Sequence, residues 1–297
     1  MTRGRSGGVL LVALTAVTVA ALLAVGASLA LRASLARISG AAELAGSSRA
    51  ALAGIERFTV EILSCDSNDF DAATEIWRLP FPAKDDPEAG LFAIVPEFPG
   101  GDAVPSIDEE SRIPLNTCPE EPLAAIIASL SGKSLQTAKA MAADIVAARP
   151  LHRREFLRAI PSIDGDTYLA ILPHVTAAPV DKININTASR QVLEALFAAA
   201  ARYGASSSAK SLAAKILDFR AKGGVFESLD PAAMDAALGG LNQTEALSLA
   251  AVKDFMTVKS RYFSGAAVSG GARVVFTFDK EEGALPRIAI GRAPGIF

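Results

Sequence analysis

The sequence predicts an α+β protein in which a long N-terminal helix packs on an antiparallel sheet and an all-helical domain is inserted into that body. Three observations support this prediction. The chain begins with an apolar segment that continues into an amphipathic helical pattern, its last 40 or so residues contain three strand-like segments, and its middle holds two similar helical segments in tandem. A helix and a sheet that each have one apolar face bury those faces together, which makes the helical middle an insertion.

The apolar segment, residues 9–31, begins at Val9, ends at Leu31 and contains no charged residue. In a helix, about 23 residues cover roughly 34 Å, which is enough to cross a hydrocarbon core of about 30 Å. Arg3 and Arg5 precede it, and a short basic leader favours a cytoplasmic N-terminus. We therefore expect a single-pass membrane anchor.

A cleaved secretory signal is the alternative to an anchor, with Ser28, Leu29 and Ala30 as the small-residue site. The apolar run is, however, longer than the roughly 7 to 15 residues of a usual signal core. The retained anchor is the favoured interpretation.

Helical periodicity continues beyond the anchor, which indicates one long helix with a membrane half and an amphipathic half. The apolar positions on its face are Leu31, Leu35, Ile38, Leu52, Ile55, Phe58 and Ile62. Strands are expected at residues 257–268, 272–278 and 285–291. A further hairpin is expected where residues 104–108 and 112–115 flank the acidic turn Glu109-Glu110-Ser111.

An acidic segment follows the long helix, and its oxygen atoms suggest a calcium site formed by Asp66, Asp69 and Asp71. The spacing does not fit an EF-hand loop, which needs a glycine at its sixth position. A solvated acidic loop without a cofactor is the favoured alternative.

The only two cysteines, Cys65 and Cys118, both follow the anchor and would lie in an oxidising compartment. A disulfide between them would close a loop of about 50 residues and contribute roughly 4 kcal/mol. Two buried free thiols are the alternative, and the sequence leaves both open.

A repeat of about 70 residues is the most informative pattern in the rest of the chain. Ile113-Pro114-Leu115-Asn116-Thr117 recurs as Ile183-Asn184-Ile185-Asn186-Thr187, and two amphipathic helices follow each copy. The units cover about 113–182 and 183–254. We interpret Asn116, Thr117, Asn186 and Thr187 as residues that end a strand and cap the next helix, with Thr117 and Glu120 forming a capping box.

Composition argues against two functional classes. The net charge of −3 and pI of about 5.6 are unfavourable for a protein that grips nucleic acid through phosphates. The two histidines, His152 and His174, belong to no Cys/His cluster, and the sequence has neither a phosphate-binding glycine loop nor a nucleophile elbow. We expect neither an enzyme nor a nucleic-acid-binding protein.

A basic leader that ends in glycine before an apolar helix resembles the leader of type IV pilin-like proteins. That resemblance implies cleavage by prepilin peptidase after Gly8, which leaves Val9 as the mature, methylated N-terminus. Most members carry Glu at the fifth mature position, whereas this chain has Ala13.

The order of motifs along nearly the whole chain resembles the minor pseudopilin K (GspK) family of type II secretion. The motifs are the acidic segment ending at Trp77, the run from Ile107 to Asn116, the run from Ile183 to Ala188, and Ser260-Arg261-Tyr262-Phe263. The resemblance implies a pilin-like body, a helical insertion of two SAM-like or helix-hairpin-helix-like units, and a place at the pseudopilus tip with minor pseudopilins I and J. It also implies an inner-membrane protein with a periplasmic C-terminal part. The expected divisions are a leader 1–8, a membrane helix 9–31, a first body part 32–115, an insertion 116–254 and final strands 255–297.

Some members of that family bind calcium in the helical domain. Here the compact, apolar run from Asp144 to Arg149 lacks the acidic residues of the corresponding segment, which argues against such a site.

The second unit also resembles the helix-hairpin-helix of membrane-anchored competence DNA receptors, over residues 183–230. Those units bind phosphate through a Gly-hydrophobic-Gly turn. This chain has residues 198–208 at that place, and Ser131-Gly132-Lys133 in the first unit. DNA binding is therefore the less favoured alternative.

Overall fold

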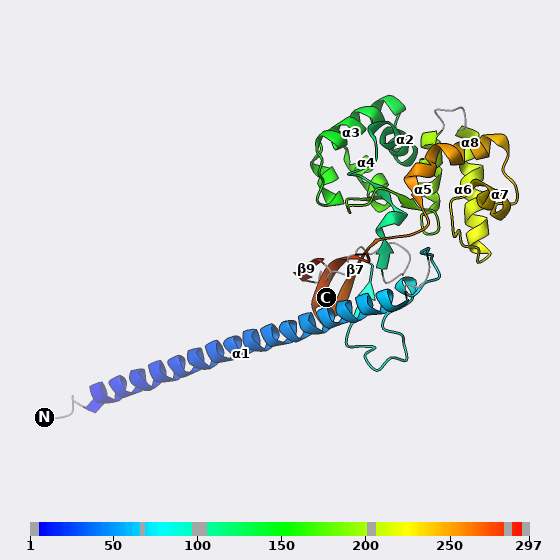
Figure 1. Ribbon diagram of the computed structural model, residues 1–297. Coiled ribbons are helices and arrows are strands. Elements are labelled where there is room, and N and C mark those ends of the chain that lie inside the picture. The colour runs from blue at the N-terminus through cyan, green and yellow to red at the C-terminus, as the bar shows by residue number, and fades with distance from the viewer. Residues whose placement is uncertain (1–5, 66–68, 97–105, 201–205, 282–286, 293–297) are drawn as a thin grey trace.

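A computed structural model describes residues 6–65, 69–96, 106–200, 206–281 and 287–292 of the chain. Helix α1 (Ser6–Cys65) projects far beyond the other elements, and its C-terminal part lies against a small sheet. The remaining helices gather beyond this sheet, away from α1 (Figure 1). The α+β architecture expected from the sequence is confirmed.

Helix α1 is one continuous helix of 60 residues. Its buried hydrophobic residues are spaced as one helical stripe and pack on the sheet: Ala51, Ile55, Phe58 and Ile62. Gly54 lies beside this stripe, at a point where a Cβ would collide with the ring of Phe92. A glycine is therefore required for the helix to approach the sheet this closely.

The sheet of the body is antiparallel throughout. β1 (Ala93–Val95) and β2 (Ser106–Asp108) both pair with β7 (Tyr262–Ser269), opposite its C-terminal and its N-terminal part respectively. β7 pairs with β8 (Ala272–Asp279), which pairs with β9 (Arg287–Arg292). The three C-terminal strands predicted by alternation are confirmed.

Aromatic rings fill the space between α1 and the sheet. The Phe58 centroid lies 5.1 Å from that of Phe81 and 6.0 Å from that of Phe276. Trp77, in the 3-10 helix η1 (Ile76–Arg78), lies 5.3 Å from Phe263. Such edge and tilted contacts add to the apolar burial that fixes α1 on the sheet.

The hairpin predicted around residues 109–111 is wrong. Residues 109–111 form the 3-10 helix η2 (Glu109–Ser111), and β3 (Ile113–Pro114) leaves the sheet to pair in parallel with β4 (Val175–Thr176). The physical reason is that Glu109 and Glu110 are buried and accept hydrogen bonds, so this acidic turn is not solvated.

The helical part contains two units built on the same plan. The first has α2 (Glu120–Ser131), α3 (Leu135–Ala147), η3 (Arg154–Ala159), α4 (Gly165–Ile171) and η4 (Leu172–His174). The second has β5 (Ile183–Asn184), α5 (Arg190–Ala199), α6 (Ser206–Ala221), α7 (Pro231–Ala237), α8 (Gln243–Val252), η6 (Lys253–Phe255) and β6 (Met256–Thr257). β5 pairs in parallel with β6, as β3 does with β4. One apolar core runs through both units, so they form a single packed domain.

Candidate functional site

The N-terminal part of α1 is an exposed apolar rod. Side chains 8–43 are all exposed, and α1 is the one helix in the described part of the chain that is long and apolar enough to cross a membrane. Its most apolar 18-residue stretch has a mean hydropathy of 2.6. Gly8 and Val9 lie inside this helix, and Ala13 is on its surface. This surface is therefore suited to lipid or to neighbouring apolar helices.

A bare arm of α1, residues 32–43, separates the anchor from the part of the helix that packs on the body. Leu35 and Ile38 on this arm are 57% and 66% exposed. Beyond the arm, Leu44 is half-buried and Ser47 lies against Gly270 in the turn between β7 and β8. The arm thus presents apolar side chains that this chain alone does not cover among its described residues.

A buried polar cluster joins the body to the helical domain. Lys280 Nζ donates to Asp71 Oδ1 at 2.6 Å, and both side chains are 2% exposed. Asp71 Oδ2 accepts from the Ser260 backbone nitrogen at 2.7 Å. Asn184 of β5 donates to Ser260 Oγ at 2.6 Å, and Ser260 Oγ donates to Asp108 Oδ2 at 2.6 Å. The loop after α1, the sheet and the helical domain therefore share one hydrogen-bond network.

Of the three residues suggested as a calcium site, the structure describes Asp69 and Asp71, and their side chains lie in different surroundings. Asp66 lies outside the described residues, Asp69 is exposed, and Asp71 points into the buried cluster. The ammonium group of Lys280 forms an ion pair with the carboxylate of Asp71. Within the described ranges, no three His, Cys, Asp or Glu residues are grouped so that they could hold a metal ion.

Several carboxyl groups around this cluster hold protons more tightly than usual. Burial raises the pKa of Asp108 to about 6, against hydrogen bonds from Ser260 and Thr187 that lower it. Burial, together with the charge of Asp108, raises the pKa of Glu110 well above its usual value. Burial and the charge of Asp71 raise the pKa of Glu75 to about 7.

Glu109 is the carboxylate that the fold keeps charged. Burial would raise its pKa, but Arg112 and the hydroxyl groups of Ser264 and Thr176 outweigh burial and bring the pKa below the usual value. Arg112 Nη1 lies 3.1 Å from Glu109 Oε1, and both side chains are less than 10% exposed. A buried pair satisfied in this way holds the segment after β2 in place.

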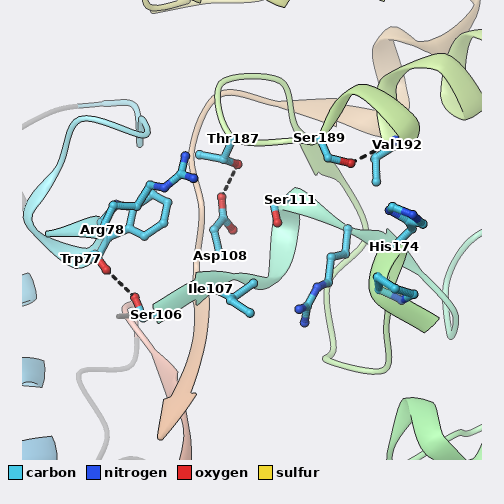
Figure 2. Close-up of a pocket in the computed structure, with 12 residues that line it drawn as sticks. Trp77, Arg78, Ser106, Ile107, Asp108, Ser111, His174, Thr187, Ser189 and Val192 are labelled. Atoms are coloured by element: carbon cyan, nitrogen blue, oxygen red, sulfur yellow. Dashed lines mark hydrogen bonds between the residues drawn. The ribbon is translucent and has the colours of Figure 1, made fainter. Parts of the chain in front are cut away.

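A pocket of about 200 Å³ opens beside this cluster, where η1, η2, η4 and the start of α5 meet (Figure 2). Figure 2 shows Asp108 and Thr187 pointing toward each other, and Thr187 Oγ1 donates to Asp108 Oδ2 at 2.5 Å. Basic and hydroxyl side chains dominate the polar lining: Arg78, Arg112, His174, Ser111 and Ser189.

The repeated asparagines make the same contact in each unit. Asn116 Nδ2 donates to the Leu151 carbonyl at 2.9 Å, and the Leu151 nitrogen donates to Asn116 Oδ1 at 2.8 Å. Asn186 makes the equivalent pair with the backbone of Phe226, both at 2.9 Å. Each asparagine therefore clamps a distant loop through a complete amide pair.

The capping role predicted for the Asn-Thr pairs is wrong. The cap of α2 is Pro119, without a side-chain hydrogen bond, and Thr117 Oγ1 instead donates to the Val180 carbonyl at 2.7 Å. Helix α5 is capped by Ser189, while Thr187 turns to the buried cluster. In both units the helix begins too late for Asn or Thr to reach its first amides.

Two arginines complete the repeated clamps. Arg149 Nε donates at 2.8 Å and Nη2 at 2.5 Å to backbone carbonyls of its unit. Arg220 Nη1 donates at 2.6 Å and 3.4 Å in the second unit. The carbonyl acceptors are Leu115 and Cys118 for Arg149, and Ile185 and Ala188 for Arg220. These acceptors stand at equivalent places in the repeat.

Cys118 is a free, buried thiol, and burial raises its pKa to about 12. The side chain of Cys65, the other half of the expected disulfide, lies outside the described residues. At Cys118 the structure therefore favours the free-thiol alternative.

In the first unit, the turn that stands in place of a Gly-hydrophobic-Gly hairpin makes contacts within the chain. Gly132 has φ of 69° and ends α2, and Lys133 Nζ lies 2.7 Å from Asp164 Oδ2. The corresponding turn of the second unit includes residues 201–205, which lie outside the described residues.

The sequence-based analysis missed the roles of Asp108, Asn184, Ser260 and Lys280. Lys280 lies 209 residues from Asp71, and Ser260 lies 152 residues from Asp108, so no local pattern links them. The local sequence gives one clue to the role of Lys280, because this lysine comes directly after a strand in which every second residue is buried.

Among the solved structures similar to this chain is a chain of a complex described as the GspK-GspI-GspJ complex from the enterotoxigenic Escherichia coli Type 2 Secretion System. The two chains are 15% identical with a TM-score of 0.55, and the match covers 88% of this chain and 99% of that chain. No family model matches the chain, and no curated protein matches its sequence. The chain has a GspK-like fold, which agrees with the resemblance seen in its motifs.

Proposed function

We propose that this chain is a minor pseudopilin of a type II secretion system that stands at the tip of the pseudopilus. The main observation is that a bare apolar helix, a small antiparallel sheet and a helical domain occur together in a fold that matches a chain of the GspK-GspI-GspJ complex along nearly its whole length. The role is assembly. The proposal assigns the chain no catalytic step and no cofactor.

The partners proposed are two smaller pseudopilins that correspond to GspI and GspJ. The exposed arm of α1 supports this, because Leu35 and Ile38 present apolar surface beyond the membrane segment. An apolar stripe on a helix is stable in water only when another surface covers it. Helices of the partner subunits are suitable covers.

A tip position follows from Ala13. In pilin-like filaments the carboxylate at the fifth mature position pairs with the N-terminal amine of a neighbouring subunit in apolar surroundings. Ala13 offers no charge, so a subunit stacked beyond this chain would keep an unpaired buried amine, which costs several kcal/mol. The helical domain, which extends far from α1, would also collide with the next turn of a filament (Figure 1).

Processing by prepilin peptidase between Gly8 and Val9 belongs to the same proposal, as does an orientation with the body in the periplasm. N-terminal mass analysis of membrane-extracted protein tests the cleavage, and we expect a mature chain that begins at Val9. A chain that begins at Leu31 would instead support the cleaved secretory signal.

The decisive experiment is coexpression of the full chain with the two smaller pseudopilins, followed by purification in detergent and measurement of stoichiometry. We expect a stable complex with one copy of each chain. A homopolymer that contains this chain along its length would refute the tip position. Salt-sensitive binding of duplex DNA tighter than micromolar would favour the DNA-receptor alternative.

A further inference from the structure

Two arginines follow the anchor directly on helix α1. Leu31 is the last residue of the apolar segment, and Arg32 and Arg37 come one and six residues later. Both side chains are exposed, and in the part of the chain that the structure describes neither guanidinium has a hydrogen bond or an ion pair. The two cations are therefore available to an anion from outside the chain.

The sequence around these arginines contains no acidic residue. The first Asp or Glu of the whole chain is Glu43, and the next is Glu56. Side chains on a helix meet at spacings of three or four residues, whereas Glu43 lies 6 residues from Arg37 and 11 from Arg32. Glu43 instead accepts a hydrogen bond from Ser39 Oγ at 3.4 Å. Neither arginine has an anion within helical reach.

The side of the membrane on which they lie is unusual for arginine. In the proposed orientation the residues after the anchor are on the exported side, whereas Lys and Arg beside a membrane helix are normally in excess on the cytoplasmic side. Arg3 and Arg5 satisfy that tendency, but they belong to the leader that the proposed cleavage removes. Arg32 and Arg37 do not help to orient the anchor, so a different role accounts for their charge.

The rise of α1 brings both arginines to the headgroup layer of a bilayer. A bilayer of about 40 to 45 Å with a hydrocarbon core of about 30 Å has roughly 5 to 8 Å of headgroups on each side. Along the continuous helix, Arg32 lies about 2 Å beyond Leu31 and Arg37 about 9 Å beyond it. Helical side chains lean toward the N-terminus, which here is toward the membrane, so Arg37 reaches back into this layer. Arg32 keeps its stem beside the hydrocarbon and its charged end among the headgroups.

The arginines also leave the apolar stripe of the arm free for partner helices. At about 100° per residue, Leu35 and Ile38 are about 60° apart around the helix. Arg32 lies about 60° beyond Leu35 on one flank of this stripe, and Arg37 about 100° beyond Ile38 on the other. Lipid on the flanks and protein on the stripe are therefore compatible.

From this placement we infer that Arg32 and Arg37 bind the phosphates of anionic phospholipid headgroups on the exported face of the membrane. A guanidinium binds phosphate oxygens through paired N–H donors, and its charge is attracted to an anionic lipid surface. The inference rests on the membrane anchor of the proposed function and adds the class of lipid that the anchor selects.

The test uses the full chain in detergent micelles and native mass spectrometry with added phosphatidylglycerol or phosphatidylcholine. Both lipids have a phosphate, but only phosphatidylglycerol has a net negative charge. We expect phosphatidylglycerol to bind roughly 20-fold more tightly, at about fivefold for each arginine. The double variant Arg32→Gln/Arg37→Gln should bind the two lipids about equally, whereas Arg32→Lys/Arg37→Lys, which keeps the charge, should retain most of the preference.

The matched control is Arg49→Gln, compared with Arg32→Gln alone. Arg49 is exposed on the same helix and the substitution removes the same charge, but Arg49 lies about 27 Å beyond Leu31, outside the headgroup layer. Arg32→Gln should weaken phosphatidylglycerol binding about fivefold, and Arg49→Gln should leave it within about twofold of the wild type. All these side chains are exposed, so thermal unfolding of the body should be unchanged in every variant.

Three results would overturn the inference. The first is equal binding of the two lipids by the wild type, and the second is undiminished binding of phosphatidylglycerol by the double glutamine variant. The third is an equal loss in Arg49→Gln, which would indicate attraction by net charge alone. Failure of the anchor itself gives a different result, because the chain would then begin at Leu31 and be absent from the membrane fraction, and the inference would fall with it.

Discussion

Single side chains hold the helical units closed, and Asn186 is the clearest example. Its amide makes two hydrogen bonds with the Phe226 backbone and is 2% exposed, so Asn186→Ala leaves a buried N–H and a buried carbonyl without partners. We expect the free energy of unfolding to fall by about 2 to 4 kcal/mol. Asn116→Ala, at a less buried site, should cost about 1 to 2 kcal/mol. Urea unfolding followed by circular dichroism measures both free energies. Equally small losses in the two variants would contradict the role of these asparagines in holding the loops.

The buried pair of Lys280 and Asp71 predicts a larger effect. Lys280→Met leaves the carboxylate of Asp71 buried without its cation, and we expect a loss of about 3 to 5 kcal/mol. Adding Asp71→Asn removes that uncompensated charge and should restore much of the loss. Lys259→Met, at an exposed lysine, is the control and should change stability by less than about 0.5 kcal/mol.

Glu75 should make the stability of the protein depend on pH, in a direction that its raised pKa determines. Burial and the charge of Asp71 raise its pKa from the ordinary 4.5 to about 7 in the folded protein, so the folded state binds more protons between these two pH values. The free energy of unfolding therefore falls as the pH rises through this window. Between pH 5 and 8, Glu75→Gln should reduce this fall in the free energy of unfolding by about 1 to 2 kcal/mol. The effect is not larger because solvent screens a side chain that is only half-buried. Unfolding curves at both pH values test this, and an unchanged difference would contradict it.

At the scale of elements, two glycines of α1 should respond in opposite ways. Alanine is favoured over glycine in a helix by up to about 1 kcal/mol, and a Cβ at Gly46 would meet nothing within 4 Å, so Gly46→Ala should stabilise the chain. At Gly54 a Cβ would collide with the Phe92 ring, and overpacking should cost about 1 to 3 kcal/mol. Thermal unfolding of the two variants is the measurement. Stabilisation by Gly54→Ala would mean that α1 does not pack on Phe92 as described.

The elements that were predicted correctly are those with long periodic patterns. Helix α1 joins a continuous apolar run to an apolar stripe at helical spacing, and β8 alternates buried and half-buried side chains along its whole length. The two-residue strands β3 and β5 are too short to show a period, and their partners lie far away in the sequence. Residues 109–111 were predicted to be a hairpin turn, because burial of Glu109 and Glu110 by distant hydroxyl and amide donors leaves no local signal.

The same reason limits prediction of the sites. The cleavage between Gly8 and Val9 and the tip position argued from Ala13 were inferred from local sequence, and both stay predictions. The clamps of Asn116 and Asn186 were noticed as a repeat, but their partners lie 35 and 40 residues away, so a nearby helix cap was the simpler interpretation.

At the scale of the whole molecule, the bare arm should matter for assembly and not for folding. Replacing Leu35 and Ile38 together by serine should lower the yield of the complex with partner pseudopilins, while the unfolding temperature of the body stays the same, because both side chains are exposed. Leu247→Ser is the matched control, since Leu247 is 56% exposed on α8 of the helical domain. Equal yields for all three proteins would exclude the arm from the interface.

The parallel pairing at the base of each helical unit has a kinetic consequence. β2 pairs with β7, although Asp108 and Ser260 are 152 residues apart in the sequence. Closing a loop of that length has a high cost in chain entropy. Once β3 has paired with β4 and β5 with β6, the ends of each unit are neighbours, and the loop that remains is equivalent to roughly 20 residues. This shortening lowers the entropic cost of closing the sheet by about 2 kcal/mol. Each helical unit closes a shorter loop than the 152 residues between Asp108 and Ser260, so the units are expected to fold first and to bring the last strands to the sheet beside α1.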